Sequence, residues 1–179
     1  MKLSNLFENA FTDHRQIKDW LDRMGVWRYT INDNGVVDVE SNVDLCRKDL
    51  TIIPVQFGYV SGTFNCAHNH LTSLKGSPRE VGGNVLCIGN NFNDLVGGPR
   101  EVGGYFDCMS NNLKTLRGAP TIVGGEFYCG DNQLTDLQGA PREVGSNFWC
   151  TDNLFKQEPD PSFINIGGEF IWDNMFKDD

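Results

Sequence analysis

The chain has 179 residues, of which 39% are hydrophobic and 22% are charged, and its formal net charge is -9. This length is enough for one domain with a sizeable core, and the 20 glycines indicate a folded, turn-rich protein. The negative charge argues against binding to nucleic acid or anionic membranes, which require clusters of Lys and Arg, and favours a protein partner that is basic or of mixed charge.

The first residues do not read as a targeting or membrane segment. Residues 1–5 lack the long apolar stretch of a signal peptide, and no run in the sequence approaches the roughly 20 apolar residues of a membrane span. We therefore expect a cytoplasmic protein that does not engage a membrane. Its six cysteines are expected to be reduced thiols, because five of them recur at equal spacing, which is a stacking pattern rather than a cross-linking pattern.

The N-terminal region predicts helical structure over residues 4–24. Asn5 with Glu8 fits a capping box, Thr12 and Asp13 offer a second helix start, and Gly25 fits a helix stop, so the pattern predicts one helix or two. The apolar residues that recur at helical spacing are Leu6, Phe7, Ala10, Phe11, Ile17, Trp20, Leu21 and Met24.

A β-hairpin is predicted next. Two stretches rich in β-branched and aromatic residues, 26–31 and 36–39, flank a turn that ends in Asn34 and Gly35. Helix and hairpin together would make an N-terminal cap over residues 1–40, because the first turn of a solenoid needs its open apolar end covered.

From residue 41 onward the sequence repeats with a period of 21. The repeated pattern is V-G-G-x-F-x-C-x-x-N-x-L-x-x-L-x-G-x-P, which is clearest over residues 102–120. The cysteines that mark the period are Cys66, Cys87, Cys108, Cys129 and Cys150. Repeats of this length are typical of solenoids, so residues 41–179 are predicted to form one.

The positions inside each repeat predict which side chains point inward. Phe and Cys alternate around one variable residue, as Phe106 and Cys108 do, which indicates a short strand with both side chains in the core. Leu45 takes the Cys position in the first repeat and Trp172 takes it in the last, so Cys46 is predicted to face outward. The result is a parallel sheet of about seven short strands, centred near residues 44, 65, 86, 107, 128, 149 and 171. The Asn three residues after each Cys is predicted to form a buried amide ladder.

The pattern F-x-C-x-x-N-x-L-x-x-L over residues 106–116 resembles the leucine-rich repeat. The sequence of residues 53–66 and the recurrent P-R-E-V-G-G-x-F motif, as at 99–106, resemble leucine-rich-repeat proteins encoded by tailed bacteriophages. The resemblance implies an α+β repeat protein: a leucine-rich-repeat solenoid capped by an N-terminal helix and β-hairpin.

The sequence contains motifs that resemble catalytic and metal-binding sites, but each has a simpler structural explanation. Residues 124–127 and 167–170 spell the Gly-Gly-Glu-Phe signature of diguanylate cyclases, but the position of Glu126 holds Tyr105 in the preceding repeat, so Glu fills a variable position. Cys66 and His68 suggest zinc, yet the strand pattern turns them to opposite sides, and cysteines stacked in a line cannot form a tetrahedron. We therefore predict a non-enzymatic protein with no catalytic residue, no metal site and no cofactor.

The open face of the predicted sheet is the candidate binding surface, because its residues vary from repeat to repeat while the interior rows do not. Exposed Tyr, Trp, Met and Leu in one patch are typical of contact sites, and nearby acids suit a basic partner. The predicted partner-binding residues are Leu86, Ile88, Tyr105, Asp107, Met109, Glu126, Tyr128, Asp131, Trp149, Asp152 and Ile171.

The sequence thus predicts a protein-binding module that docks a partner through the open face of its sheet and inhibits or redirects that partner. The partner would be a host protein, for example a defence enzyme, or a phage protein. Two alternatives stay open. The first is a phage structural, assembly or self-association element built by stacking solenoid ends. The second is an enzyme or nucleotide binder that uses the N-terminal cap.

Overall fold

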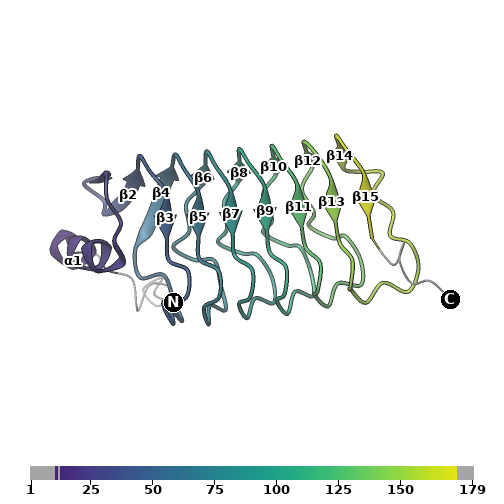
Figure 1. Cartoon of the computed structure of the whole chain (residues 1–179), viewed down its shortest axis with the longest axis horizontal. Coiled ribbons are helices and arrows are strands. Elements are labelled where there is room, and N and C mark those ends of the chain that lie inside the picture. Colours follow the sequence, from purple (N-terminus) through teal and green to yellow (C-terminus); the bar gives the residue numbers. More distant parts are fainter. Residues whose placement is uncertain (1–10, 12, 173–179) are drawn as a thin grey trace, which may run out of the picture.

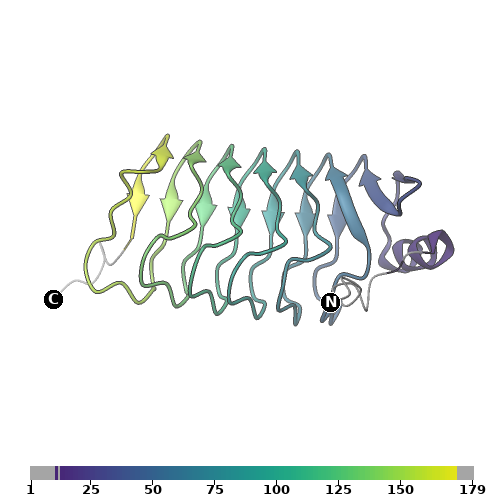
Figure 2. The same cartoon turned by 180° about the vertical axis from the view of Figure 1, so that it is seen from behind.

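The computed structural model describes residue 11 and residues 13–172 and shows an elongated β-solenoid with one short helix at its N-terminal end (Figure 1, Figure 2). Successive coils stack along the long axis of the molecule, and each coil contributes strands to two parallel sheets. Within the described part of the chain, no helix has both the length and the hydropathy needed to cross a bilayer.

The helix α1 (His14–Met24) lies across the N-terminal end of the solenoid. The side chain of Asp13 accepts a hydrogen bond from the amide of Arg15 and so caps the helix, and Gly25 ends it in a left-handed conformation. The predicted second start and the predicted stop are both confirmed, whereas the capping box at Asn5 and Glu8 lies outside the described residues. The buried face of α1 consists of Ile17, Trp20 and Leu21.

The predicted hairpin forms from β1 (Tyr29–Ile31) and β2 (Val36–Val39), which pair antiparallel. β2 also pairs in parallel with β4 (Gln56–Val60), so the hairpin continues one of the solenoid sheets. The N-terminal region therefore covers the core with α1 and extends the sheet with β1.

The sheet that the sequence predicts is present as seven parallel strands. Their order is β15-β13-β11-β9-β7-β5-β3, and neighbouring coils align Phe with Phe at the inward position wherever both carry it. The strands are β3 (Val43–Asp44), β5 (Phe64–Asn65), β7 (Val85–Leu86), β9 (Phe106–Asp107), β11 (Phe127–Tyr128), β13 (Phe148–Trp149) and β15 (Phe170–Ile171).

A second sheet, of eight strands, was not predicted. Its order is β1-β2-β4-β6-β8-β10-β12-β14, and all its pairs except β1 with β2 are parallel. The strands not yet introduced are β6 (Glu80–Val81), β8 (Glu101–Val102), β10 (Ile122–Val123), β12 (Glu143–Val144) and β14 (Asn165–Ile166). The fold is thus a two-sheet β-solenoid in which each coil has a strand on either side of a tight turn.

The glycine pairs of the repeat form this turn between the two sheets. A Cβ at Gly124 would overlap the carbonyl oxygen of Gly103 in the preceding coil. The amide of Gly124 meanwhile donates to the carbonyl of Val102 at 2.8 Å. Glycine is required here because successive coils approach backbone to backbone.

The interior rows lie where the repeat predicts. Phe106 and Cys108 are fully buried, whereas Tyr105, which directly precedes β9, is half-buried. The predicted inward and outward sides of the strand are therefore confirmed. Leu45 is fully buried and Cys46 is partly exposed, as expected for the first coil. The eight-stranded sheet adds an inward row of its own, formed by Val81, Val102, Val123 and Val144.

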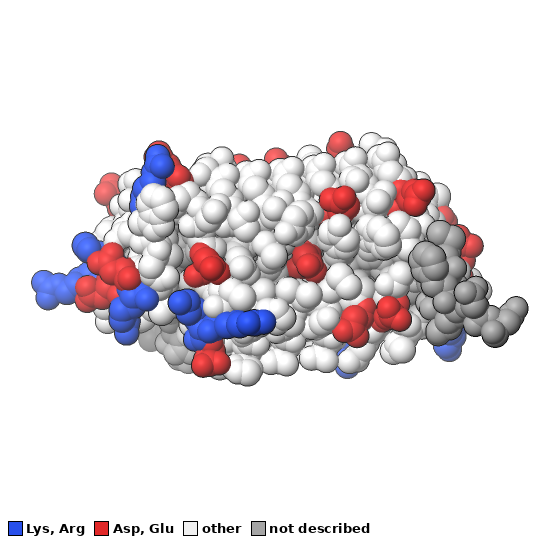
Figure 3. Space-filling model, viewed as in Figure 1, with Lys and Arg blue, Asp and Glu red and all other residues white. Residues whose placement is uncertain are grey.

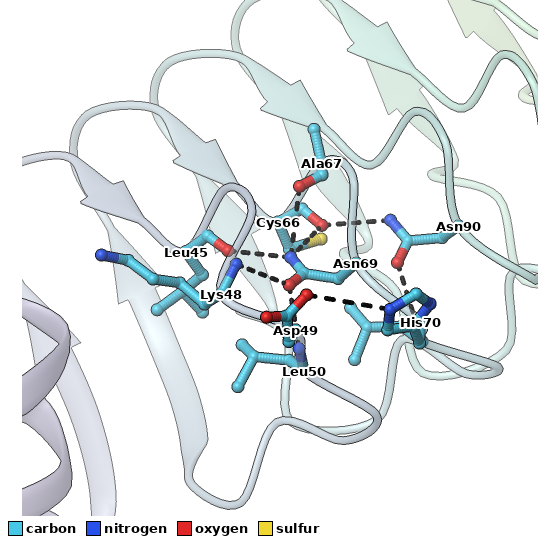
Figure 4. Close-up of polar contacts among 10 residues, drawn as sticks. Leu45, Lys48, Asp49, Leu50, Cys66, Ala67, Asn69, His70 and Asn90 are labelled. Carbon is cyan, nitrogen blue, oxygen red and sulfur yellow. Dashed lines mark hydrogen bonds and ion pairs between the residues drawn. The ribbon is translucent and has the colours of Figure 1, made fainter.

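The predicted asparagine ladder is confirmed and links each coil to the one before it (Figure 4). The amide nitrogen of Asn69 donates to the carbonyls of Leu45 at 2.8 Å and Cys66 at 3.0 Å, and its oxygen accepts from the amides of Lys48 and Leu50, each at 3.0 Å. One buried side chain thus satisfies backbone groups of two coils. The same arrangement recurs at Asn90, Asn111, Asn132 and Asn153.

Candidate binding face on the seven-stranded sheet

The outward side chains of the seven-stranded sheet form straight rows across the coils. Register pairs Leu86 with Asp107, Asp107 with Tyr128, Tyr128 with Trp149, and Trp149 with Ile171. Because neighbouring strands lie about 4.8 Å apart, these side chains are direct neighbours. The structure therefore brings the predicted row together on one surface.

Aromatic rings form the centre of this surface. Tyr105 meets Tyr128 edge to face with ring centroids 6.1 Å apart, and Tyr128 stacks on Trp149 at 6.3 Å with 20° between the ring planes. All three side chains are half-buried, so each keeps surface that a partner can cover. The indole N–H of Trp149 is buried and has no acceptor among the described residues. We call Tyr105, Tyr128 and Trp149 the aromatic cluster.

The apolar residues around the aromatic cluster differ in exposure. Leu86 and Ile88 lie in the coil before that of Tyr105, Met109 lies in the coil of Tyr105, and all three are half-buried. Ile171, at the C-terminal end of the row, is only 7% exposed. The accessible apolar surface of this row therefore ends at Trp149, and Ile171 adds little to it.

Carboxylates surround the aromatic cluster. Asp107 is half-buried and accepts a hydrogen bond from the amide of Met109 at 3.0 Å; burial raises the pKa of its carboxyl, an effect that this bond and the nearby His68 oppose. Burial, and then the charges of Glu126 and Asp107, raise the pKa of Tyr128. The hydroxyl of Tyr128 is therefore neutral at physiological pH and can donate a hydrogen bond.

Two further predicted residues, Asp131 and Asp152, are exposed where each coil leaves the sheet. Both adopt a left-handed backbone conformation, with φ of 52° and 53°. Asp tolerates this conformation better than most residues, so the turn accounts for part of its presence there. Their carboxylates still add negative charge to this edge of the face.

Basic side chains are sparse on this face. In Figure 3 Lys and Arg gather toward the N-terminal end, while the middle of the face is mainly uncharged with separate acidic side chains. From the second coil onward, the outward positions one and three residues before the ladder Cys, and one and two residues after it, contain no Lys or Arg. The face therefore combines partly exposed aromatic surface with negative charge that no Lys or Arg in the same rows offsets.

The histidines and cysteines do not assemble into a reactive site among the described residues. Cys66 is fully buried and His68 is exposed, so the two diverge as predicted. His70 lies 3.8 Å from Asp49 on an exposed loop (Figure 4). Burial raises the pKa of the Cys66 thiol to about 12, which makes it a poor nucleophile. No group of three or more His, Cys, Asp or Glu side chains in the described ranges could hold a metal ion.

Trp27 is exposed although the sequence predicts it to lie in a strand of the hairpin. The sequence predicts a strand over residues 26–31, but β1 starts only at Tyr29 and Trp27 is 60% exposed. The reason is Arg28, whose left-handed backbone, with φ of 58°, breaks the strand. Trp27 borders a groove of about 520 Å³ beside β3.

Comparison of the chain with models of known protein families, with curated proteins and with solved structures gives no match. The arrangement of the residues described above therefore carries the functional argument.

Proposed function

We propose that this protein is a non-enzymatic binding module that docks a partner protein on the outer face of its seven-stranded sheet. The observation that carries the proposal is the aromatic cluster, in which Tyr105, Tyr128 and Trp149 contact one another and remain partly exposed. Tyr and Trp contribute most of the binding energy in many interfaces, and they do so from the centre of the patch. A two-sheet solenoid presents them rigidly, so little conformational entropy is lost on binding.

The charge of the face defines the chemistry of the partner. Asp107, Glu126, Asp131 and Asp152 border the aromatic cluster without Lys or Arg in the same rows. A partner segment rich in Arg or Lys would offset these carboxylates, and an Arg side chain could also stack on the aromatic rings. We therefore infer a basic or mixed-charge protein surface as the ligand.

We further propose that the coils are leucine-rich repeats of the kind encoded by bacteriophages. Support comes from the Phe-x-Cys-x-x-Asn pattern and from the way each Asn bonds the backbone of two coils, as at Asn111. On this proposal the protein acts in the cytoplasm of an infected bacterium, where it binds a host or phage protein and inhibits or redirects it. A bacterial defence enzyme is a suitable target.

The test compares two outer faces of the same protein. Immobilised wild-type protein is used to isolate its partner from host lysate, and the affinity of the purified partner is then measured for Tyr128→Ala, Trp149→Ala and Glu143→Ala. The first two variants are expected to lose about 2 kcal/mol or more of binding free energy each, which is typical of interface anchors. Glu143→Ala on the eight-stranded sheet is the matched control and should bind like the wild type.

Two results bear directly on the assignment. If the partner binds Tyr128→Ala and Trp149→Ala with unchanged affinity, the seven-stranded face is not the docking site. If the partner contacts the face through an acidic surface, the proposed charge complementarity is wrong. Circular dichroism and the midpoint of urea unfolding check that each variant is folded.

A further inference from the structure

The two sheets of the solenoid do not end at the same level at the N-terminal end. The eight-stranded sheet continues beyond β2 to β1, whereas the seven-stranded sheet stops at β3 in the coil that contains β2. Among the described residues, one strand position beside β3 is therefore vacant. An unpaired edge of this kind is a template for an additional strand.

The interior coils show which backbone groups the vacant position offers. The amides of Val43 and Leu45 donate to the next coil, at Thr63 and Asn65, with distances of 2.8 and 2.7 Å. Because alternate residues of a parallel strand point their N–H and C=O groups to opposite sides, those of Asp44 point toward the vacant position. They have no hydrogen-bond partner among the described residues.

The same register extends to the residues on both sides of Asp44. Thr63, Asn65 and Ala67 accept from the preceding coil, so the carbonyls of their equivalents Asn42, Asp44 and Cys46 point to the edge. That of Asn42 accepts a long bond of 3.3 Å from the Ser41 hydroxyl and keeps room for a second donor. The amide of Cys46 is bound by the Asp44 carboxylate at 3.0 Å. A parallel strand with three amides at alternate positions would therefore repeat the pairing seen between every two coils.

A groove runs beside this edge, and we call it the β3 groove. Its volume is about 520 Å³, and its lining includes Met24, Trp27, Arg28, Glu40, Asp44 and Lys48. Trp27 is the most exposed large hydrophobic residue in the described chain, at 60%. The four charged side chains form no ion pair with another described residue. The groove thus combines an apolar wall, an unpaired strand edge and charges of both signs.

The shape of the N-terminal end selects the occupant. α1 and β1 extend past the level of β3 (Figure 1, Figure 2), so the core of a second solenoid cannot approach the β3 edge in line. A single extended segment needs no more room than one strand. The vacancy therefore suits a peptide segment better than a second copy of the chain.

We propose that β3 binds one extended segment of a partner protein as an added parallel strand. Apolar residues at alternate positions of the segment would point into the β3 groove toward Met24 and Trp27. A Lys or Arg between them would lie beside the Asp44 carboxylate, as cross-strand pairs of opposite charge do. The site is separate from the aromatic cluster and does not depend on the function proposed for it.

The experiment uses the full chain and short synthetic peptides with blocked ends. The probe peptide alternates Val with polar residues and carries Lys at the position beside Asp44. A control peptide is identical except that the three pairing amides are N-methylated. At about 1 mM peptide, hydrogen exchange of the Asp44 amide, followed by NMR, is expected to slow about tenfold with the probe and not at all with the control.

Variants locate the bound peptide. Trp27→Ala should weaken binding of the probe about tenfold or more, because the groove loses its apolar wall. Asp44→Asn keeps the bond to Cys46, as Asn65 does with Ala67 at 3.1 Å, and should remove only the preference for Lys over Glu in the peptide. Trp149→Ala leaves the β3 groove intact and should bind the probe normally.

Three outcomes would overturn the proposal. Equal protection of Asp44 by the N-methylated peptide would show that no strand is added, and absence of protection by the probe would show that the edge does not accept one. A concentration-dependent dimer that Trp27→Ala abolishes would assign the groove to a second copy. Loss of probe binding in Trp149→Ala, with Trp27→Ala unaffected, would move the site to the aromatic cluster.

Discussion

The two sheets are built by the same coils, yet their outer surfaces follow different rules. On the eight-stranded sheet the outward position repeats in part: Glu80, Glu101 and Glu143 share it, Ile122 lies between the last two, and Tyr59 and Asn165 take it in the first and last of these coils. On the seven-stranded sheet the outward position changes at every coil, as the step from Asp107 to Tyr128 illustrates.

The difference separates what the fold needs from what a partner can use. In three coils a Glu follows an Arg, at residues 79–80, 100–101 and 142–143. These charged side chains suit a face that stays in contact with water. Tyr128 and Trp149, in contrast, expose aromatic surface to water. The fold does not require an aromatic residue at this position, because other coils have Leu86 or Asp107 there. Equivalent positions in successive coils can therefore be compared with one another, and the positions where the residue type varies mark the candidate site.

The two sheets must enclose a core that is closed to solvent if their outer faces are to be compared in this way. The reactivity of the inward-facing thiols tests whether the core is closed, and it gives the largest expected effect. Burial raises the pKa of Cys66 to about 12 and holds those of Cys87, Cys108 and Cys129 well above the ordinary range of a thiol. In the native protein at pH 8 we expect Cys46 to react with a disulfide reagent at least about 1,000-fold faster than the buried thiols, because the thiolate is the nucleophile.

The control is Cys46→Ser, which should leave no rapidly reacting thiol until the protein is unfolded. A second fast thiol in that variant would mean that the inner cysteine row opens in solution. The inward side of the strand would then not be a closed core, and the contrast between repeated and variable positions would lose its basis.

The asparagine ladder gives the next largest effect. Replacing Asn111 by Ala removes one of the two donors of the carbonyls of Cys87, Cys108 and Met109. It also leaves the amide of Phe92 without its acceptor. An orphaned buried amide costs about 1–3 kcal/mol and each lost hydrogen bond about 0.5–1.5 kcal/mol, so we expect the free energy of unfolding to fall by about 3 kcal/mol or more, measured by urea denaturation.

Asn112→Ala is the matched control for the ladder. Asn112 is half-buried, and its side chain accepts only a long bond of 3.4 Å from Gln133. Its replacement should cost about 0.5 kcal/mol or less. Similar losses for both variants would show that the ladder does not hold the coils together.

The sequence was sufficient for the interior of the seven-stranded sheet because two signals agree there. The period of 21 aligns Phe with Phe, and the alternation within each repeat assigns Phe106 and Cys108 to one side. The eight-stranded sheet lacked a comparable signal. Each of its repeat strands has two residues with one inward side chain, such as Val102, which is too short for an alternation to be recognised.

The candidate site was predictable where it depends on the coil and less so where it depends on an end. The contacts of Tyr105, Tyr128 and Trp149 follow from stacking equivalent positions. The low exposure of Ile171 and the high exposure of Trp27 depend on packing at the two ends, where the repeat no longer defines the neighbours. Sequence periodicity carries no information about those contacts.

Asp107 places a charge within the variable row of the seven-stranded sheet. Burial is the main cause of its raised pKa. The folded state therefore holds the proton more tightly than the unfolded chain, and the free energy of unfolding falls as pH rises from about 4 through the folded-state pKa. Asp107→Asn removes this cost and keeps an acceptor for the amide of Met109, as Asn65 does for Ala67.

We expect Asp107→Asn to be more stable than the wild type at pH 7 and to lose that advantage below about pH 4, in urea denaturation over a pH series. A stability difference that stays the same at all pH values would mean that desolvation of the charge is not its cause. If a bound partner offsets the Asp107 charge, its binding should stabilise the wild-type protein more than the Asp107→Asn variant.

The smallest expected effect tests the repeated surface itself. Ile122 is 38% exposed and lies between Glu101 and Glu143, so Ile122→Glu completes the acidic row of the eight-stranded sheet. Repulsion between neighbouring carboxylates opposes the change, but solvent screens it, and we expect a loss of about 0.5 kcal/mol or less in urea denaturation.

The matched change on the other sheet is Tyr128→Glu, which breaks the ring contacts with Tyr105 and Trp149 and should cost about 1–2 kcal/mol. If Ile122→Glu proved the more damaging of the two, the eight-stranded surface would not be a tolerant solvated face. Ile122 would then be a packing or contact residue, and its departure from the Glu row would have to be weighed in the same way as Tyr128 and Trp149 are weighed on the seven-stranded sheet.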